Sequence, residues 1–269
     1  MRWIMGVVAV GMVMGVVAKA QSLPATSPTQ VPAQVSPKAA ANPPLAAAPL
    51  SPEDERKMEL DNAKMKAQLL DWAQLGKYRA ANAALTAPVK VVFFGDSITE
   101  AWEYNGGSFF PGKPYLNRGI SGETTPQMLV RFRQDVVDLH PETVVILAGT
   151  NDIAGNTGPS TPEMIEDNFK GMVEIAKANG IRVILASVTP VAMYPWRPEI
   201  ADVPAKIAVV NAWLKDYCVQ EKLTYLDYWT AMAGPDGGMK PGISKDGVHP
   251  NAAGYAIMQP LAEAAIAGK

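Results

Sequence analysis

Cysteine, histidine and excess charge are all scarce in this chain of 269 residues. Its one cysteine, Cys218, cannot form a disulfide within the chain, and the sequence has no Cys-x-x-Cys or Cys/His cluster to hold a metal ion. The formal net charge is only -2 and long runs of like charge are absent, so we expect no basic face for nucleic acid. These shortages leave His140 and His249 as the only histidines that could serve as a general base.

The first 20 residues predict a secretory signal peptide. Arg2 precedes an apolar stretch over residues 3–18, and the small residues Ala18 and Ala20 are typical of a cleavage site, so we expect cleavage before Gln21. A retained membrane anchor is the alternative, although the stretch is short for a spanning helix. No cysteine follows the cleavage point, which disfavours a lipid anchor. We therefore expect an exported protein, periplasmic or secreted, that meets the membrane only through this segment.

Three further regions follow the signal segment. Residues 21–50 are rich in Pro and Ala, which predicts a disordered linker because such a composition cannot bury a core. Ser51 and Pro52 are typical of a helix start, with an N-cap and then proline at the first helical position. We expect one helix from Pro52 to about Ala80, in an N-terminal region (51–84) that packs on the outside of a main domain (85–269).

Short apolar runs alternate with helical segments in the main domain. Continuous apolar runs are typical of strands buried on both faces, and helical periodicity separates them. Such alternation predicts an α/β fold, a three-layer α/β/α sandwich around a mostly parallel, five-stranded sheet. Ligands in such folds bind beyond the carboxyl ends of the strands. The expected strands are 89–94, 115–117, 144–147, 183–186 and 223–226, and the main helices begin near Thr125, Thr161 and Asn251 and cover 207–217.

A serine and a histidine lie where such an edge would bring them together. Ser97 follows the first expected strand, at a probable helix start, where an ordinary N-cap serine is the alternative interpretation. A serine hydroxyl needs a base to act as a nucleophile near neutral pH. His140 precedes a strand and so belongs to the opposite edge, which leaves His249 as the base by elimination. Asp246 could accept the other ring N–H of His249, and it also suits the turn before Gly247.

Two other loops at this edge contain residues that could stabilise negative charge. Asn151 follows the third expected strand and could direct its side-chain amide at an oxyanion. Gly119 follows the second strand, and its N–H could be another donor. Taken singly, each is more often a turn residue.

The sequence blocks Gly95-Asp96-Ser97, Asn117-Arg118-Gly119, Gly149-Thr150-Asn151-Asp152 and Asp246-x-x-His249-Pro250 together resemble the SGNH hydrolases of the GDSL esterase/lipase superfamily. The similarity is greatest to the subgroup of platelet-activating factor acetylhydrolase catalytic subunits. Its four blocks occur in family order, although Ile98 replaces the leucine of the family name. Position 99 is Thr, so the Gly-x-Ser-x-Gly elbow of other hydrolases is absent.

The resemblance implies a flavodoxin-like SGNH hydrolase fold and a serine ester hydrolase with residues 85–269 as its catalytic domain. Ser97 would be the nucleophile, His249 the base and Asp246 its partner, while Ser97, Gly119 and Asn151 would form the oxyanion hole. Neither a metal nor another cofactor would be needed. The expected ligand is a small-molecule or glycan ester, and the sequence leaves the oligomeric state open.

The substrate is inferred from less specific residues. We expect Trp102, Arg118, Tyr194 and Trp196 to contact it, although Trp196 could instead anchor a proline-rich loop. Export favours an O-acetyl ester of a carbohydrate. The alternatives are a lysophospholipase or thioesterase, an acyltransferase, or, from another class, a non-catalytic glycan-binding module.

Overall fold

The structure is a computed structural model that describes residues 51–268. The expected signal peptide (1–20) and linker (21–50) lie outside the described residues. None of the helices within 51–268 combines the length and the apolar character that a membrane crossing requires.

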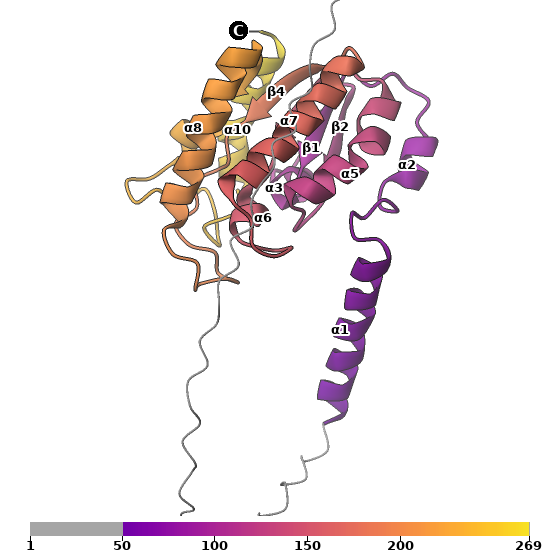
Figure 1. The fold of residues 1–269 in the computed structure, drawn as a ribbon, viewed down its shortest axis with the longest axis vertical. Helices are drawn as coiled ribbons and strands as arrows, with labels where there is room; N and C mark the ends of the chain where they lie inside the picture. The colour runs from indigo at the N-terminus through magenta and orange to yellow at the C-terminus, as the bar shows by residue number, and fades with distance from the viewer. Residues whose placement is uncertain (1–50, 269) are drawn as a thin grey trace, which may run out of the picture. The chain divides into compact units, whose positions relative to one another are not determined.

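The centre of the fold is a sheet of five parallel strands in the order β2-β1-β3-β4-β5 (Figure 1). The α/β prediction is confirmed, and every expected strand is present with ends that differ by a few residues. The strand order reverses after β1, so the carboxyl ends of β1 and β3 flank the switch point where ligands bind in such sheets. The strands are β1 (Val91–Gly95), β2 (Tyr115–Gly119), β3 (Thr143–Leu147), β4 (Arg182–Ala186) and β5 (Thr224–Leu226).

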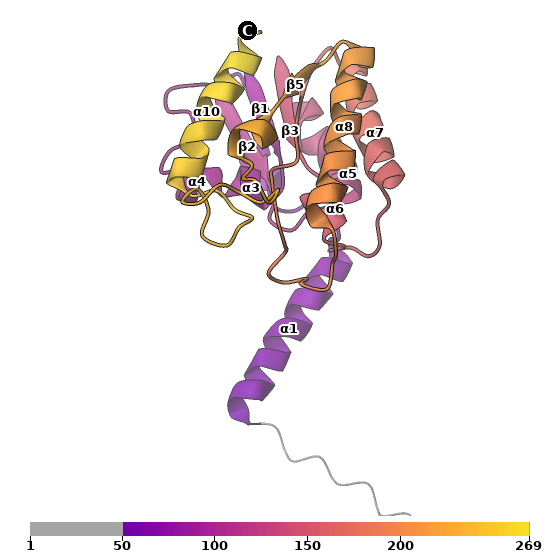
Figure 2. The ribbon, with the colours of Figure 1, turned by 90° about the vertical axis from the view of Figure 1, so that its left-hand side faces the viewer.

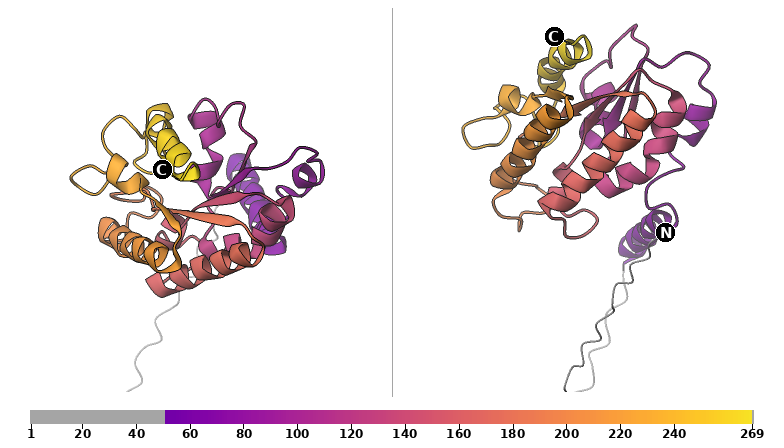
Figure 3. Two further views of the ribbon diagram at one scale, coloured as in Figure 1. Left: turned by 90° about the horizontal axis from the view of Figure 1, so that it is seen from above. Right: turned by 45° about the horizontal axis from the view of Figure 1, so that its top comes forward.

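Helices cover both faces of the sheet, which makes the expected three layers (Figures 2 and 3). Alternate residues of each strand enter opposite cores, as strand geometry requires. Val92 and Phe94 contribute to the core beneath α5 (Thr125–Asp135), α7 (Pro162–Ala178) and α8 (Val203–Glu221). Val91 and Phe93 contribute to the core beneath α10 (Ala252–Ile266). The shorter helices are α3 (Ser97–Glu100), α4 (Trp102–Asn105), η1 (Val137–Leu139), α6 (Thr150–Ile153) and α9 (Tyr228–Met232).

The N-terminal helix is shorter than its sequence indicates. The expectation of one helix to Ala80 is wrong, because α1 (Pro52–Leu70) ends before Asp71 and a short α2 (Arg79–Ala83) follows. The Asp71 carboxylate accepts the backbone N–H groups of Leu75 and Gly76, each at 2.8 Å, and this turn replaces the helical bonds. The large apolar side chains of α1 are exposed, and only its last turns line a cavity together with the main domain on whose outside the helix was expected to pack.

A fully buried arginine joins several of these elements. Arg131 on α5 is paired with Glu123, and its Nη1 lies 3.3 Å from Asp135 Oδ2. Its other bonds go to the carbonyl oxygens of Gly95 and Arg118, both at 2.9 Å, at the ends of β1 and β2. Burial raises the pKa of Glu123 to about 7, against the opposing effect of Arg131. The charged group therefore joins the end of β1, which flanks the switch point, to the end of β2.

Replacement of Arg131 by leucine should lower the free energy of unfolding by roughly 3–5 kcal/mol, because it leaves buried carboxylates without their cation. Arg133→Leu on the same helix is the matched control, since the Arg133 side chain is 66% exposed and should change stability by less than about 0.5 kcal/mol. Urea unfolding of the two variants measures the difference. Equal losses would show that the buried ion cluster does not stabilise the fold.

Candidate active site

Ser97 stands at the first turn after β1, next to the switch point. Asp96 caps α3, its Oδ1 accepting the Ile98 N–H at 2.9 Å, so Ser97 begins the helix. No hydrogen bond among residues 51–268 uses the Ser97 N–H. The Ser97 N–H can therefore donate a hydrogen bond to the same ligand group that the Ser97 hydroxyl contacts.

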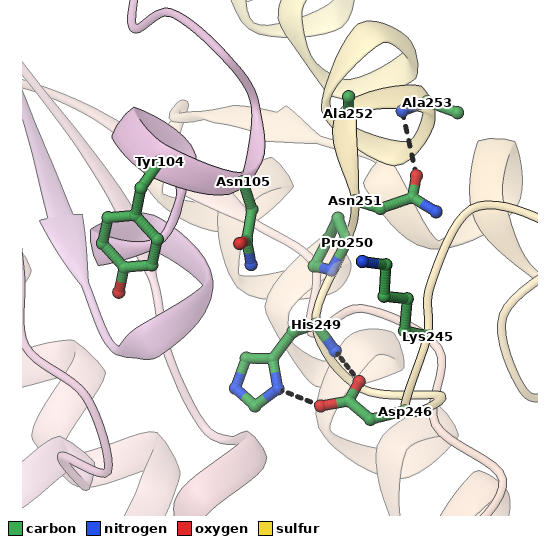
Figure 4. Close-up of a pocket in the computed structure, with 9 residues that line it drawn as sticks. All are labelled: Tyr104, Asn105, Lys245, Asp246, His249, Pro250, Asn251, Ala252 and Ala253. Carbon is green, nitrogen blue, oxygen red and sulfur yellow. Dashed lines mark hydrogen bonds and ion pairs between the residues drawn. The ribbon is translucent and has the colours of Figure 1, made fainter.

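His249 and Asp246 lie side by side in the loop before α10 (Figure 4), and His249 contacts Ser97. Ser97 Oγ lies 2.8 Å from His249 Nε2, and His249 Nδ1 lies 2.6 Å from Asp246 Oδ2. With the ring proton on Nδ1, Nε2 can accept the serine proton. A buried hydrogen bond of 2.7 Å from the Tyr255 hydroxyl to the Ile98 carbonyl joins α10 to α3 and so fixes the two sides of this pair.

The Asp246 carboxylate is held in its ionised form. Partial burial alone would raise its pKa, but hydrogen bonds from the backbone and ring of His249 and from the Val248 N–H lower it well below its ordinary value. The backbone bonds are 2.8 Å and 3.0 Å long and both reach Asp246 Oδ1. An anion fixed on Nδ1 both selects the tautomer and stabilises an imidazolium. The other histidine, His140, is exposed before β3 at the opposite edge.

Asn151 lies on α6, directly after β3. Its Nδ2 donates to the Glu123 carbonyl at 3.0 Å, and its Oδ1 accepts from Asn156 Nδ2 at 2.8 Å. These two bonds assign the orientation of the amide, with one N–H of Nδ2 left for a ligand. Asn151 therefore remains suitable as an oxyanion donor.

The expectation that Gly119 supplies an oxyanion donor is wrong. Its N–H already donates to Asn117 Oδ1 at 2.9 Å. A Cβ at Gly119 would also lie 2.1 Å from Glu100 N and 2.7 Å from Asp96 O, so the absence of a side chain allows β2 to pack against the start of α3. Gly119 is a packing residue.

Gly122, which sequence reasoning missed, is a candidate for the oxyanion donor expected of Gly119. Its φ is +80°, a left-handed conformation that favours glycine, and no hydrogen bond within 51–268 uses its N–H. Asn156 Nδ2 donates to the Gly122 carbonyl at 3.3 Å as well as to Asn151, so Asn156 links the two candidate donors. The turn signal Ser121-Gly122, three residues after Gly119, could have indicated this position.

Three of the expected substrate contacts are buried structural residues, and these interpretations are wrong. Trp102 is 2% exposed and packs on the Tyr255 ring, with centroids 5.0 Å apart. The buried Arg118 guanidinium lies 4.6 Å from the centroid of the Tyr78 ring. Tyr194 is fully buried, with its hydroxyl 3.0 Å from Thr150 Oγ1. None of the three presents its side chain to a ligand.

Trp196, the fourth expected contact, does lie beside the histidine. It is 42% exposed, and its ring centroid is 6.4 Å from that of His249. Its Nε1 donates to Asn156 Oδ1 at 3.2 Å, so the indole is held next to the candidate oxyanion donors. Trp196 can therefore contact a ligand bound at Ser97.

A cavity of about 620 Å³ opens on the histidine side (Figure 4). Its size falls within the range of small-molecule sites. Its wall combines apolar side chains with polar groups that could bond to a hydroxyl-bearing ligand. Its lining includes Tyr104, Asn105, Lys245, Asp246, His249 and Asn251.

The fold and the sequence blocks define a hydrolase of the SGNH type, and comparison with known proteins agrees. The sequence model of the GDSL-like lipase/acylhydrolase family matches residues 93–257, and the chain belongs to this family. Membership places the protein among the ester hydrolases, as the four sequence blocks predict.

The chain is similar to several individual proteins. A GDSL-like lipase of Bacteroides thetaiotaomicron is 45% identical, with a TM-score of 0.70, over 73% of this chain and 98% of that one. An acetylxylan esterase of Geobacillus stearothermophilus (18% identical, TM-score 0.54, 68% of this chain and 95% of that one) shares the fold. An uncharacterized lipoprotein of Bacillus subtilis is 31% identical over 121 residues, 38% of this chain; the chain spans only 49% of that relative.

Asp96 should make the protein less stable as the pH rises from about 4 to about 7. Burial raises its pKa from 3.8 to about 7, so the folded protein keeps a proton that the unfolded chain has released. Its contribution to the free energy of unfolding then falls by up to about 1.4 kcal/mol per pH unit across this window.

The variant Asp96→Asn lacks this contribution. Its free energy of unfolding, measured in urea and taken relative to wild type, should therefore increase from pH 4 to pH 7. A difference that is independent of pH would mean that Asp96 titrates normally.

Proposed function

We propose that the protein is an exported esterase that removes short acyl groups, acetyl in particular, from carbohydrate esters. Ser97 is its nucleophile, His249 its base, and Asp246 the anion that orients the base. The observation that carries the proposal is the continuous chain of contacts of 2.8 Å and 2.6 Å from Ser97 Oγ through the imidazole to the carboxylate.

The first half of the reaction forms an acyl-enzyme. Ser97 Oγ attacks the ester carbonyl carbon while its proton moves to His249 Nε2. The carbonyl oxygen becomes an oxyanion, which accepts hydrogen bonds from the Ser97 N–H, the Gly122 N–H and Asn151 Nδ2. The loss of one such donor typically lowers kcat by a factor on the order of 10²–10³. His249 then returns the proton to the leaving alcohol as the C–O bond breaks.

The second half releases the acid. Water gives a proton to His249 Nε2 and attacks the acyl carbon, and the same donors stabilise the second oxyanion. The intermediate collapses, the carboxylic acid leaves, and Ser97 regains its proton. His249 accepts and donates the proton in each step, so no cofactor enters this scheme.

Two considerations support a carbohydrate ester as substrate. The cavity beside His249 includes the amide of Asn105 and the ammonium of Lys245, which could bond to hydroxyl groups, and the exposed face of Trp196 offers a surface for a sugar ring. An acetylxylan esterase shares the fold, although at 18% identity this likeness bears on the fold alone. A periplasmic or extracellular location, which the residues 1–20 predict, would give access to such polymers.

Ser97→Ala should abolish hydrolysis of acetyl esters, with a loss of at least about 10⁴-fold in kcat. Acetate release from p-nitrophenyl acetate and from acetylated oligosaccharides provides the measurement. Ser108→Ala, an exposed serine outside the site, is the matched control. Equal activity in the wild type and Ser97→Ala, or no activity on any ester, would refute the proposal, and the latter would favour a glycan-binding module.

The acyl preference should peak at short chains, because the cavity beside His249 lacks a closed apolar channel. A series of p-nitrophenyl esters from acetate to palmitate measures this preference as kcat/KM. A maximum at long chains would instead indicate a lysophospholipase or thioesterase. Transfer of the acetyl group to an added alcohol in preference to water would indicate an acyltransferase.

A further inference from the structure

We propose that Trp72, which precedes the family-matched segment 93–257, is a specificity-determining residue of the active site. Together with the last turns of α1, it forms a subsite for a sugar ring of the ester substrate. This inference rests on the proposed function and extends it to the N-terminal helix.

The subsite is a second cavity, of about 380 Å³. Met65, Leu69 and Trp72 line one side of it, while Gly122 and Asn156 line another. Gly122 is a candidate oxyanion donor, and Asn156 bonds to both Asn151 and Trp196. The cavity therefore adjoins the oxyanion side of the site, whereas the larger cavity adjoins His249.

The walls of this cavity differ in chemistry. Trp72 is 46% exposed, and the exposed side chains of Met65 and Leu69 extend the same apolar surface. Ser121 and Thr157 supply hydroxyl groups on the domain side, next to Asn156, whose amide is bonded within the protein. A sugar ring has apolar C–H faces and a polar rim of hydroxyl groups, so it can stack on the indole and bond to the opposite wall. A fatty acyl chain would leave these polar groups without partners.

The backbone around Trp72 is fixed to the domain, so the point from which its indole projects is set before substrate arrives. The Trp72 carbonyl accepts from Gln127 Nε2 at 2.6 Å, and the Leu75 carbonyl accepts from Gln134 Nε2 at 2.8 Å. Ala73, between them, is buried. Both glutamines belong to α5, the helix that carries Arg131. A preorganised aromatic side chain loses little entropy on binding, which is typical of a recognition residue.

Steady-state kinetics of the full chain tests the proposal on two substrates, p-nitrophenyl acetate and acetylated xylo-oligosaccharides of two to six sugars. Trp72→Ala should lower the ratio of kcat/KM for the oligosaccharides to that for p-nitrophenyl acetate by roughly 3- to 10-fold, mainly through a higher KM. Trp72→Tyr, which keeps an aromatic face, should restore most of the ratio. Leu60→Ala is the control, since Leu60 is an exposed apolar residue of α1 outside the cavity.

Each other outcome has a distinct meaning. If both substrates lose the same factor in Trp72→Ala, or if Leu60→Ala has an equal effect, Trp72 is not a specificity residue and only this inference fails. If Trp72→Ala selectively impairs p-nitrophenyl esters of long acids, the cavity holds an acyl chain and the sugar subsite is refuted. If the wild-type protein cleaves no ester at all, the proposed function itself fails.

Discussion

The buried guanidinium of Arg131 is the constraint on which the candidate site depends. An arginine cannot give up its charge inside a protein, so its burial requires acceptors on every side. Those acceptors are the Gly95 carbonyl at the end of β1, the Arg118 carbonyl near the end of β2, and the carboxylates of Glu123 and Asp135. Ser97 follows the first of these strands, and Gly122 directly precedes Glu123. One side chain therefore fixes the relative positions of the serine turn and the loop that carries the candidate oxyanion donor.

The sheet could be predicted from the sequence because strands buried on both faces are almost continuously apolar. Strand ends differ by a few residues, since Gly95 and Gly119 extend the strands without adding an apolar side chain. The end of α1 could not be predicted in the same way. Residues beyond Leu70 keep helical periodicity, and what stops the helix is a pair of bonds from backbone N–H groups to the Asp71 carboxylate.

The candidate site, like the fold, could be predicted from the sequence only in part. Elimination selected His249, because position relative to a strand decides at which edge of a parallel sheet a residue lies. Gly119 and Gly122 could not be separated by spacing alone, since the difference lies in which backbone N–H is already bonded to Asn117. Trp102 is near the first motif in sequence and Tyr194 lies in the loop after β4, yet both side chains turn into the cores. Proximity along the chain does not determine the face on which a side chain lies.

Ser97 and His249 are separated by 152 positions in the sequence. The hydrogen bond from Tyr255 on α10 to the Ile98 carbonyl on α3 holds the two segments together. The whole segment from residue 97 to residue 249 must therefore leave the ribosome before the side chains of Ser97 and His249 can meet. A nascent or truncated chain that ends before residue 249 contains the serine turn but not its histidine. The order of synthesis thus delays assembly of the pair until the last helix has docked.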